Sequence, residues 1–197
     1  TNISLPNYTN GACASRSEAD IQFALEQSCN TVFAQIAWEV GQDALAEQAE
    51  KFGFGESFSI PTPVTASQFP ETEDQAELAL SSIGQGSVTA TPLQVAMISA
   101  AIANNGVQMT PNLIKTVRAP DLSVLEEPEP KVLNESISPG TAAQLTDWMV
   151  SVVDNGTASA ARIPGVKVAG KTGTAEVQDR DDNAWCTGFA PANDPEV

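Results

Sequence analysis

The apolar residues of this chain follow helical patterns first and strand patterns later, and this order constrains the fold more than any other feature of the sequence. Before residue 156, apolar side chains recur with the period of about 3.6 residues that is typical of amphipathic helices. The helical stretches are 21–25, 32–40, 45–52, 93–100 and 145–153. Two β-prone runs follow, at 166–177 and 185–190. Helices segregated from strands predict an α+β fold rather than alternating βαβ units.

Local signals predict where some of these elements begin. Ser15–Glu18 matches a capping box, which predicts the start of the first helix. Thr91–Pro92 and Ser138–Pro139 each place a capping hydroxyl directly before a proline, which is a typical helix start. Residues 113–117 predict an additional strand, and the Pro- and Glu-rich residues 120–130 predict an exposed connection.

Composition excludes several classes of function. The chain carries 25 acidic and 9 basic residues, a formal net charge of −16. Nucleic-acid binding needs clustered Lys and Arg, so no nucleic-acid partner is expected. The sequence has no His, which excludes Ser-His-Asp and Cys-His catalysis and His-ligated metals. Three dispersed cysteines are too few for a zinc or iron–sulfur frame, so we expect neither a metal nor a cofactor.

The strongest local signal is Lys-Thr-Gly-Thr at residues 171–174, inside the first β-prone run. If this run is an edge strand, the Lys171 ammonium and the Thr172 and Thr174 hydroxyls can hold an extended anionic peptide. Gly173 leaves the backbone open to close approach by a ligand. The alternative is an ordinary strand with a solvated lysine.

A second signal, Ser28-Cys29-Asn30, falls at the junction of the first two predicted helices. A Ser hydroxyl and an Asn amide two residues apart can reach one cavity from such a turn. The hydroxyl can relay a proton, and the amide can donate and accept hydrogen bonds. The alternative is that Ser28 and Asn30 only cap a helix.

Taken together and in this order, the two motifs match part of the Ser-x-x-Lys, Ser-x-Asn and Lys-Thr-Gly signature of penicillin-binding proteins and class A β-lactamases. Other stretches are similar to the transpeptidase domain of penicillin-binding proteins, especially the monofunctional class B kind: residues 28–55, Ile83–Gly86, Thr91–Gln94, Gly156–Ala158 and Gly188–Pro191. The chain resembles this family over nearly its whole length. The resemblance implies a fold like that of penicillin-binding proteins and serine β-lactamases, in which a helical cluster lies beside an antiparallel sheet.

The chain departs from the family pattern at one motif. Ser-x-x-Lys is absent, because none of the five lysines has Ser three positions before it. We therefore expect residues 1–197 to be part of a transpeptidase domain, truncated at both ends, with the nucleophile in an upstream segment. Such a piece is expected to be inactive on its own.

The resemblance also implies a role for each candidate residue. Ser28 relays a proton toward the leaving amine, and Asn30 positions the substrate amide and the lysine of the missing motif. Lys171 supplies positive potential. Thr172 and Thr174 bind the terminal carboxylate of the substrate, and the backbone N–H of Thr174 is one oxyanion-hole donor.

Three further residues complete the expected site. Gly173 belongs to the substrate-binding strand, and Gln85 and Gly86 are expected on a loop that shapes the pocket. The alternative for that loop is a simple turn.

The implied activity is that of a peptidoglycan D,D-transpeptidase. A serine attacks the bond between two D-Ala residues of a stem peptide, and the amine of a neighbouring stem resolves the acyl-enzyme. β-Lactams are expected to acylate the same serine. Two alternatives remain: a serine β-lactamase or D,D-carboxypeptidase, which deacylates with water, and a non-catalytic penicillin-binding-like sensor or scaffold.

This substrate implies the extracytoplasmic face of a bacterial membrane, with a parent protein anchored by an N-terminal segment. That compartment permits disulfides. Cys13 and Cys29 lie 16 positions apart and flank the first predicted helix, so a bridge between them is expected. Two buried free thiols are the alternative. Cys186, in an apolar run, is expected to be a small buried hydrophobe.

Overall fold

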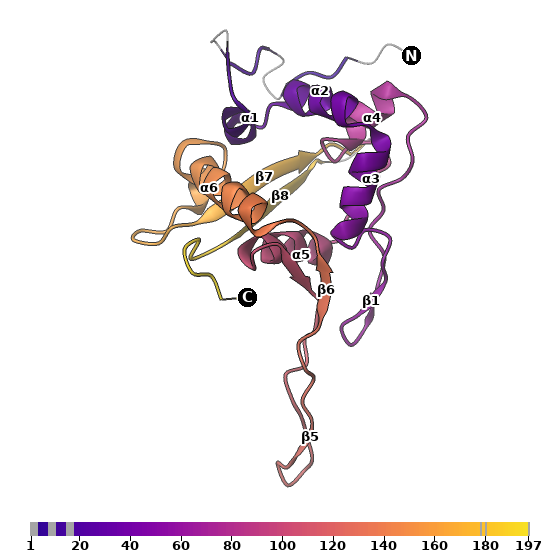
Figure 1. Cartoon of the computed structure of the whole chain (residues 1–197), viewed down its shortest axis with the longest axis vertical. Helices are drawn as coiled ribbons and strands as arrows, with labels where there is room; N and C mark the ends of the chain where they lie inside the picture. The colour runs from indigo at the N-terminus through magenta and orange to yellow at the C-terminus, as the bar shows by residue number, and fades with distance from the viewer. Residues whose placement is uncertain (1–3, 8–10, 15–17, 178, 180, 197) are drawn as a thin grey trace.

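The computed structural model describes residues 4–7, 11–14, 18–177, 179 and 181–196. Its helices in this part of the chain are α1 (Ile21–Gln27), α2 (Asn30–Val40), α3 (Gln42–Lys51), α4 (Gln75–Ser81), α5 (Pro92–Ala103), α6 (Pro139–Asn155) and the short 3-10 helix η1 (Ser159–Ala161). Figure 1 shows the first four helices on one side of the molecule and the later elements beside and below them.

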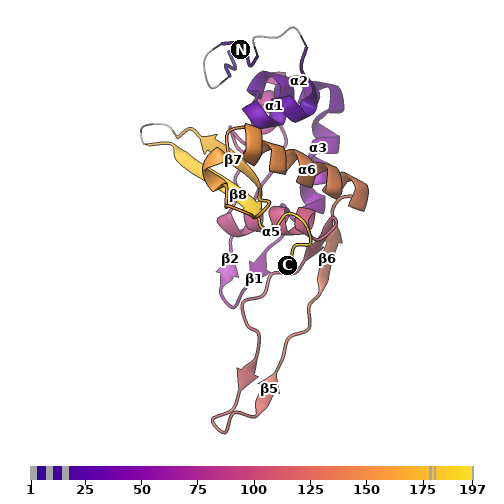
Figure 2. The same ribbon diagram turned by 90° about the vertical axis from the view of Figure 1, so that its left-hand side faces the viewer.

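The strands pair as two-stranded antiparallel sheets. The pairs are β1 (Phe58–Ser59) with β2 (Pro63–Val64), β3 (Val107–Met109) with β6 (Val132–Glu135), β4 (Val117–Arg118) with β5 (Val124–Glu126), and β7 (Ala169–Ala175) with β8 (Asn183–Phe189). The early helices and the late antiparallel β7–β8 pair confirm the α+β prediction. Figures 1 and 2 both show the β4–β5 hairpin extending away from the rest of the molecule.

Helix α6 is the centre of the core, because it packs against α1, α5 and β7. Met149 of α6 forms one apolar cluster with Ile102 of α5 and Ala169 of β7. Val152 and Val153, both at most 1% exposed, form a second cluster toward α1. Burial of these side chains fixes α1, and therefore the start of α2, beside the lysine-bearing strand β7.

Two predicted helix starts are confirmed. The Thr91 hydroxyl accepts a hydrogen bond from the N–H of Gln94, 3.1 Å away, and α5 begins at the following proline. The Ser138 hydroxyl caps α6 in the same way.

The sequence predicted that the first helix starts at Ser15–Glu18. Residues 15–17 lie outside the described residues, and Glu18 precedes the helix, so the prediction is wrong for Glu18. Helix α1 begins at Ile21 instead. The carboxylate of Asp20 accepts a hydrogen bond from the N–H of Phe23 and supplies the cap closer to the apolar run.

Other sequence predictions need correction. Of residues 113–117 only Val117 lies in a strand, and Leu113 is 71% exposed. The side chain of Asn112 accepts a hydrogen bond from the N–H of Ile114, and such local bonds compete with strand pairing. Helix α4 and strands β3, β5 and β6 were not predicted, because each is short and lacks a long apolar period.

Cys186 is exposed and free, so the prediction that it is buried is wrong. Its neighbour Thr187 points toward α5, where its hydroxyl lies 2.5 Å from that of Ser99. Because side chains alternate along a strand, Cys186 points to the opposite face of β8.

Candidate active site

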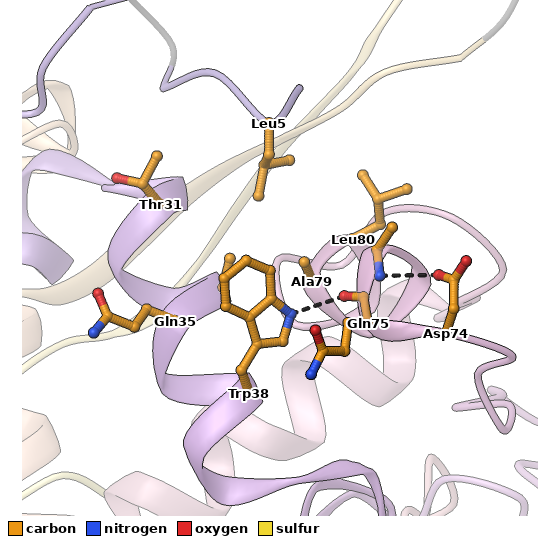
Figure 3. Close-up of a pocket in the computed structure, with 10 residues that line it drawn as sticks. Leu5, Thr31, Gln35, Trp38, Asp74, Gln75, Ala79 and Leu80 are labelled. Carbon is orange, nitrogen blue, oxygen red and sulfur yellow. Dashed lines mark hydrogen bonds between the residues drawn. The ribbon is translucent and has the colours of Figure 1, made fainter. Parts of the chain in front are cut away.

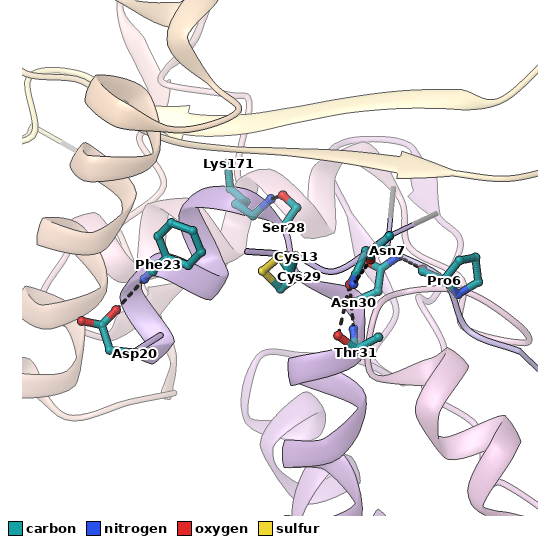
Figure 4. The surroundings of a disulfide bond; sticks show 11 residues. Pro6, Asn7, Cys13, Asp20, Phe23, Ser28, Cys29, Asn30, Thr31 and Lys171 are labelled. Carbon is teal, nitrogen blue, oxygen red and sulfur yellow. Dashed lines mark hydrogen bonds between the residues drawn. A yellow bond between two sulfur atoms is a disulfide. The ribbon is translucent and has the colours of Figure 1, made fainter. Parts of the chain in front are cut away.

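Ser28 occupies the sharp corner at which the chain leaves α1 and enters α2 (Figure 4). Its backbone has a φ of 55° and a ψ of 53°, in the left-handed region that residues other than glycine rarely adopt. Cys29, which is 1% exposed, follows directly as the N-cap of α2. Strained backbone at a polar residue is typical of functional sites. This corner turns the Ser28 hydroxyl toward β7.

Lys171 extends from β7 to this corner. Its Nζ donates a hydrogen bond to Oγ of Ser28 over 2.5 Å and another to the carbonyl of Thr172 over 2.6 Å. Burial lowers the pKa of Lys171 below the ordinary value of lysine. Among the described residues no carboxylate lies within ion-pair distance of it. The ammonium is therefore available to polarise the Ser28 hydroxyl and to attract an anionic ligand.

The edge of β7 that faces away from β8 is unpaired with any other described strand. Thr172, Gly173 and Thr174 lie along it, and Gly173 and Thr174 are exposed. An unpaired edge presents backbone N–H and C=O groups that an extended ligand can pair with. The unpaired edge of β7 and the ammonium of Lys171 are therefore parts of the same site.

Gln85 reaches this edge from the turn that follows α4. Its amide Nε2 donates to the carbonyl of Thr174 over 3.0 Å. Gly84 and Gly86, on either side of it, have φ of 74° and 68°, which glycine adopts without strain. These glycines form the turn that aims Gln85 at β7. Gly86 itself has the position of a turn residue.

The residues after α6 link the end of α1 to Thr172 of β7, a role that no sequence motif predicted. The hydroxyl of Thr157 lies 2.8 Å from that of Thr172, while its N–H donates to the carbonyl of Glu26 over 3.1 Å. A Cβ at Gly156 would overlap the same carbonyl of Glu26, so only glycine allows this close approach. The carboxylate of Glu26 accepts a hydrogen bond from Ser151 in α6.

The spacing of residues in the sequence could not predict these contacts between α1 and the end of α6. Glu26 and Ser151 lie 125 positions apart, and Glu26 belongs to a helix whose packing partner is unknown from the sequence. The sequence signal that points here is Gly156–Ala158, a stretch similar to the family but without an assigned role.

Asn30, the first residue of α2, lies on the side of the corner away from Lys171. Its amide donates to the carbonyl of Pro6 over 3.0 Å, as Figure 4 shows. The same N-terminal stretch continues at Asn7, whose side-chain oxygen accepts hydrogen bonds from Thr31. The structure therefore brings Ser28 to Lys171 but leaves the amide of Asn30 bonded to Pro6.

A disulfide joins Cys13 and Cys29, with their Cα atoms 5.6 Å apart. Because Cys29 is the middle residue of Ser-Cys-Asn, the bridge attaches the N-terminal stretch directly to the corner that carries Ser28 (Figure 4). It restrains the corner from the side opposite to β7.

A separate cavity of about 850 Å³ lies between α2 and α4 (Figure 3). The indole N–H of Trp38 donates to the carbonyl of Gln75 across it over 2.8 Å. The cavity includes none of the candidate site residues; its lining is Leu5, Thr31, Ala34, Gln35, Trp38, Asp74, Gln75, Ala76, Ala79 and Leu80. It is therefore distinct from the place where Ser28 and Lys171 meet.

Other kinds of site are absent from the part of the chain that the structure describes. There, no group of three or more His, Cys, Asp or Glu side chains could hold a metal ion. In the same residues no helix is both long and apolar enough to cross a bilayer. The chemistry that the arrangement offers is proton transfer through a hydroxyl next to a cation, beside a strand edge that can bind a peptide.

Comparison with known proteins identifies the family of the chain. The model of the penicillin binding protein transpeptidase domain family matches residues 1–197. The chain belongs to this family. Its relatives and the mixed helical and antiparallel structure confirm the resemblance to class B transpeptidases.

Two curated relatives illustrate the family. The chain is 38% identical over 98% of its length to the peptidoglycan D,D-transpeptidase PbpA of Mycolicibacterium smegmatis, and the match covers 40% of that protein. It is 30% identical over 88% of its length to the peptidoglycan D,D-transpeptidase MrdA of Acinetobacter baumannii, covering 30% of that protein. The chain thus spans less than half the length of the curated relatives it matches.

A solved structure supports the fold. Penicillin-binding protein A of M. tuberculosis, in a ceftriaxone acyl-enzyme complex, matches with a TM-score of 0.94 and 36% identity, over 99% of this chain and 45% of that one. The same protein has been solved as imipenem and penicillin G acyl-enzyme complexes. These acyl-enzymes show that penicillin-binding protein A of M. tuberculosis reacts covalently with β-lactams.

Proposed function

We propose that this chain is the middle and later part of a peptidoglycan D,D-transpeptidase that is acylated by β-lactams. The parent protein is the longer protein to which this chain would belong. The observation that carries the proposal is the contact of Lys171 with Ser28 beside the free edge of β7. The family's signature places the two motifs together at the reacting bond.

The reaction requires a nucleophile that this sequence lacks. We propose that an upstream segment of the parent protein supplies Ser-x-x-Lys and that its serine attacks the carbonyl between two D-Ala residues of a stem peptide. The serine–acyl bond forms as the bond to the terminal D-Ala breaks, and that amine leaves with a proton. The amine of a neighbouring stem peptide then takes the acyl group and releases the serine.

Ser28 and Lys171 serve the proton transfers in this proposal. The Ser28 hydroxyl passes a proton to the departing amine, and the Lys171 ammonium holds the hydroxyl in place. Asn30 positions the substrate amide and the lysine of the upstream motif. Because its amide is bonded to the Pro6 carbonyl in the ligand-free protein, that bond would be exchanged on binding.

The edge of β7 binds the substrate in this proposal. The hydroxyls of Thr172 and Thr174 accept the terminal carboxylate, and Gly173 lets the peptide approach the backbone. The N–H of Thr174 is one oxyanion-hole donor, and loss of such a donor typically costs about 100- to 1000-fold in rate. The substrate places the parent protein at the extracytoplasmic face of the cell membrane, in cell division or cell-shape maintenance.

Labelling of the parent protein with a fluorescent penicillin tests this function. We expect a covalent adduct on the serine of an upstream Ser-x-x-Lys, located by peptide mass spectrometry, and no labelling of residues 1–197 alone. A long-lived adduct supports the transpeptidase. Release within seconds supports a β-lactamase, and no adduct supports a non-catalytic sensor or scaffold.

A further inference from the structure

The side chain of Gln85 occupies a position on β7 that a ligand would need. Its Nε2 lies 3.0 Å from the carbonyl oxygen of Thr174, a residue 89 positions away. In an antiparallel strand the N–H and the C=O of one residue point to the same edge. The carbonyl that accepts from Gln85 therefore lies on the same edge as the N–H of Thr174, the oxyanion-hole donor of the proposed function.

The turn that carries Gln85 holds it rigidly. Three backbone hydrogen bonds close the end of α4: the N–H groups of Ile83 and Gln85 donate to Leu80, and that of Gly84 donates to Ser81. These bonds form a helix C-terminal motif that needs the left-handed Gly84. The amide of Gln85 is thus presented to β7 by a fixed turn rather than by a free loop.

The hydrogen bond from Gln85 to Thr174 is of the same kind as the bond that a peptide paired with β7 would make. An amide N–H that donates to the free carbonyl of an edge strand is the contact that an added strand makes. A ligand with a backbone-like amide N–H would donate to the same oxygen of Thr174. Ligand and Gln85 therefore compete for one acceptor.

We propose that Gln85 is a specificity-determining residue, which caps the Thr174 carbonyl in the ligand-free protein and is displaced by ligands that donate an amide N–H to it. This inference rests on the proposed function. Ligands without such an amide leave the Gln85 bond in place. The cap therefore penalises amide-bearing ligands by the strength of one hydrogen bond.

β-Lactams separate the two ligand classes. Penicillin G carries an acylamino N–H next to its reactive ring, whereas imipenem carries a hydroxyethyl group there. The readout is the ratio of their second-order acylation rates, measured on the parent protein. In Gln85→Ala and in the similarly long Gln85→Met, we expect this ratio to rise about 2- to 10-fold, the value of one net hydrogen bond.

Ser87→Ala is the matched control. Ser87 lies two residues further along the same loop and contacts Glu77, not β7. The control should keep the wild-type ratio. An unchanged ratio in both Gln85 variants, or a fall in it, overturns the inference. Failure of wild-type parent protein to react with either β-lactam instead overturns the proposed function, so the two failures are distinguishable.

Discussion

Nζ of Lys171 donates a hydrogen bond to Oγ of Ser28 over 2.5 Å, although 143 positions separate the two residues in the chain. The contact depends on α6, which packs against α1 on one side and against β7 on the other. In the proposed function, it joins the hydroxyl that relays a proton to the cation that holds it.

Burial lowers the pKa of Lys171, so the unfolded chain holds this proton more tightly than the folded one. The buried charge of Lys171 destabilises the folded state fully at a pH below the pKa that Lys171 has in the folded protein. This destabilisation disappears as the pH rises toward the pKa of lysine in the unfolded chain, about 10.4. The stability of wild type relative to Lys171→Met should therefore increase as the pH is raised from about 8 to about 10. Chemical denaturation of the parent protein measures this difference.

Lys167→Met is the control for that series. Lys167 is exposed to solvent. The stability of wild type relative to Lys167→Met should stay flat over the same pH range. A flat or falling difference for Lys171→Met would show that burial does not disfavour its charged form.

The bridge between Cys13 and Cys29 closes a loop with a sequence separation of 16. A loop of this size restricts the unfolded chain enough to contribute about 3 kcal/mol. Cys13→Ala should lower the free energy of unfolding of the parent protein by about this amount. A reducing agent should destabilise wild type but not the variant. Equal sensitivity of both proteins to reductant would contradict the assignment; the exposed Cys186→Ala serves as control.

Gly156 allows the close approach of α1 to the segment after α6. A methyl group there would overlap the carbonyl of Glu26, which is backbone and moves only with the Ser28 corner. Gly156→Ala should cost about 1–3 kcal/mol of stability. At Gly140 the added methyl group would lie 3.9 Å from Oγ of Ser138, so Gly140→Ala should be neutral or stabilising in thermal unfolding. Equal effects of the two substitutions would refute this account.

Thr157 orients the hydroxyl of Thr172 through a contact of 2.8 Å. Thr157→Val keeps the shape of the side chain but removes that contact. The apparent affinity for penicillin should weaken by about 2- to 10-fold, with less effect on the rate at saturation. Thr146 in α6 donates its hydroxyl proton to the Ala142 carbonyl of its own helix, so Thr146→Val should leave both quantities at wild-type values. A loss confined to the saturated rate would argue against a positioning role.

Several helices and strands could be predicted because they depend on residues that are neighbours in the sequence. The hydroxyl–proline pairs at Thr91 and Ser138 mark helix starts that the structure confirms. The two late β-prone runs overlap β7 and β8, each seven residues long. Strand β3 and helix α4 were missed because their stability comes from neighbours that are distant in the sequence.

The site divides in the same way. Ser28, Lys171 and Gln85 belong to recognisable motifs, so the sequence alone could identify them as candidate site residues. The interaction of Glu26 with Ser151 and Thr157, and the direction of Asn30 toward Pro6, depend on how helices pack after folding. No spacing in the chain encodes those contacts.

A double-mutant cycle between Ser28 and Lys171 tests the central claim most directly. The second-order rate of penicillin acylation would be measured for the parent protein, Ser28→Ala, Lys171→Met and the double variant, with the exposed Lys167→Met as control. We expect each single change to lower the rate by about 100-fold or more. Because Lys171 acts through Ser28, the double variant should be about as slow as the slower single variant. If the rate of the double variant falls by the product of the two single fold-reductions, as for two independent residues, the account is contradicted.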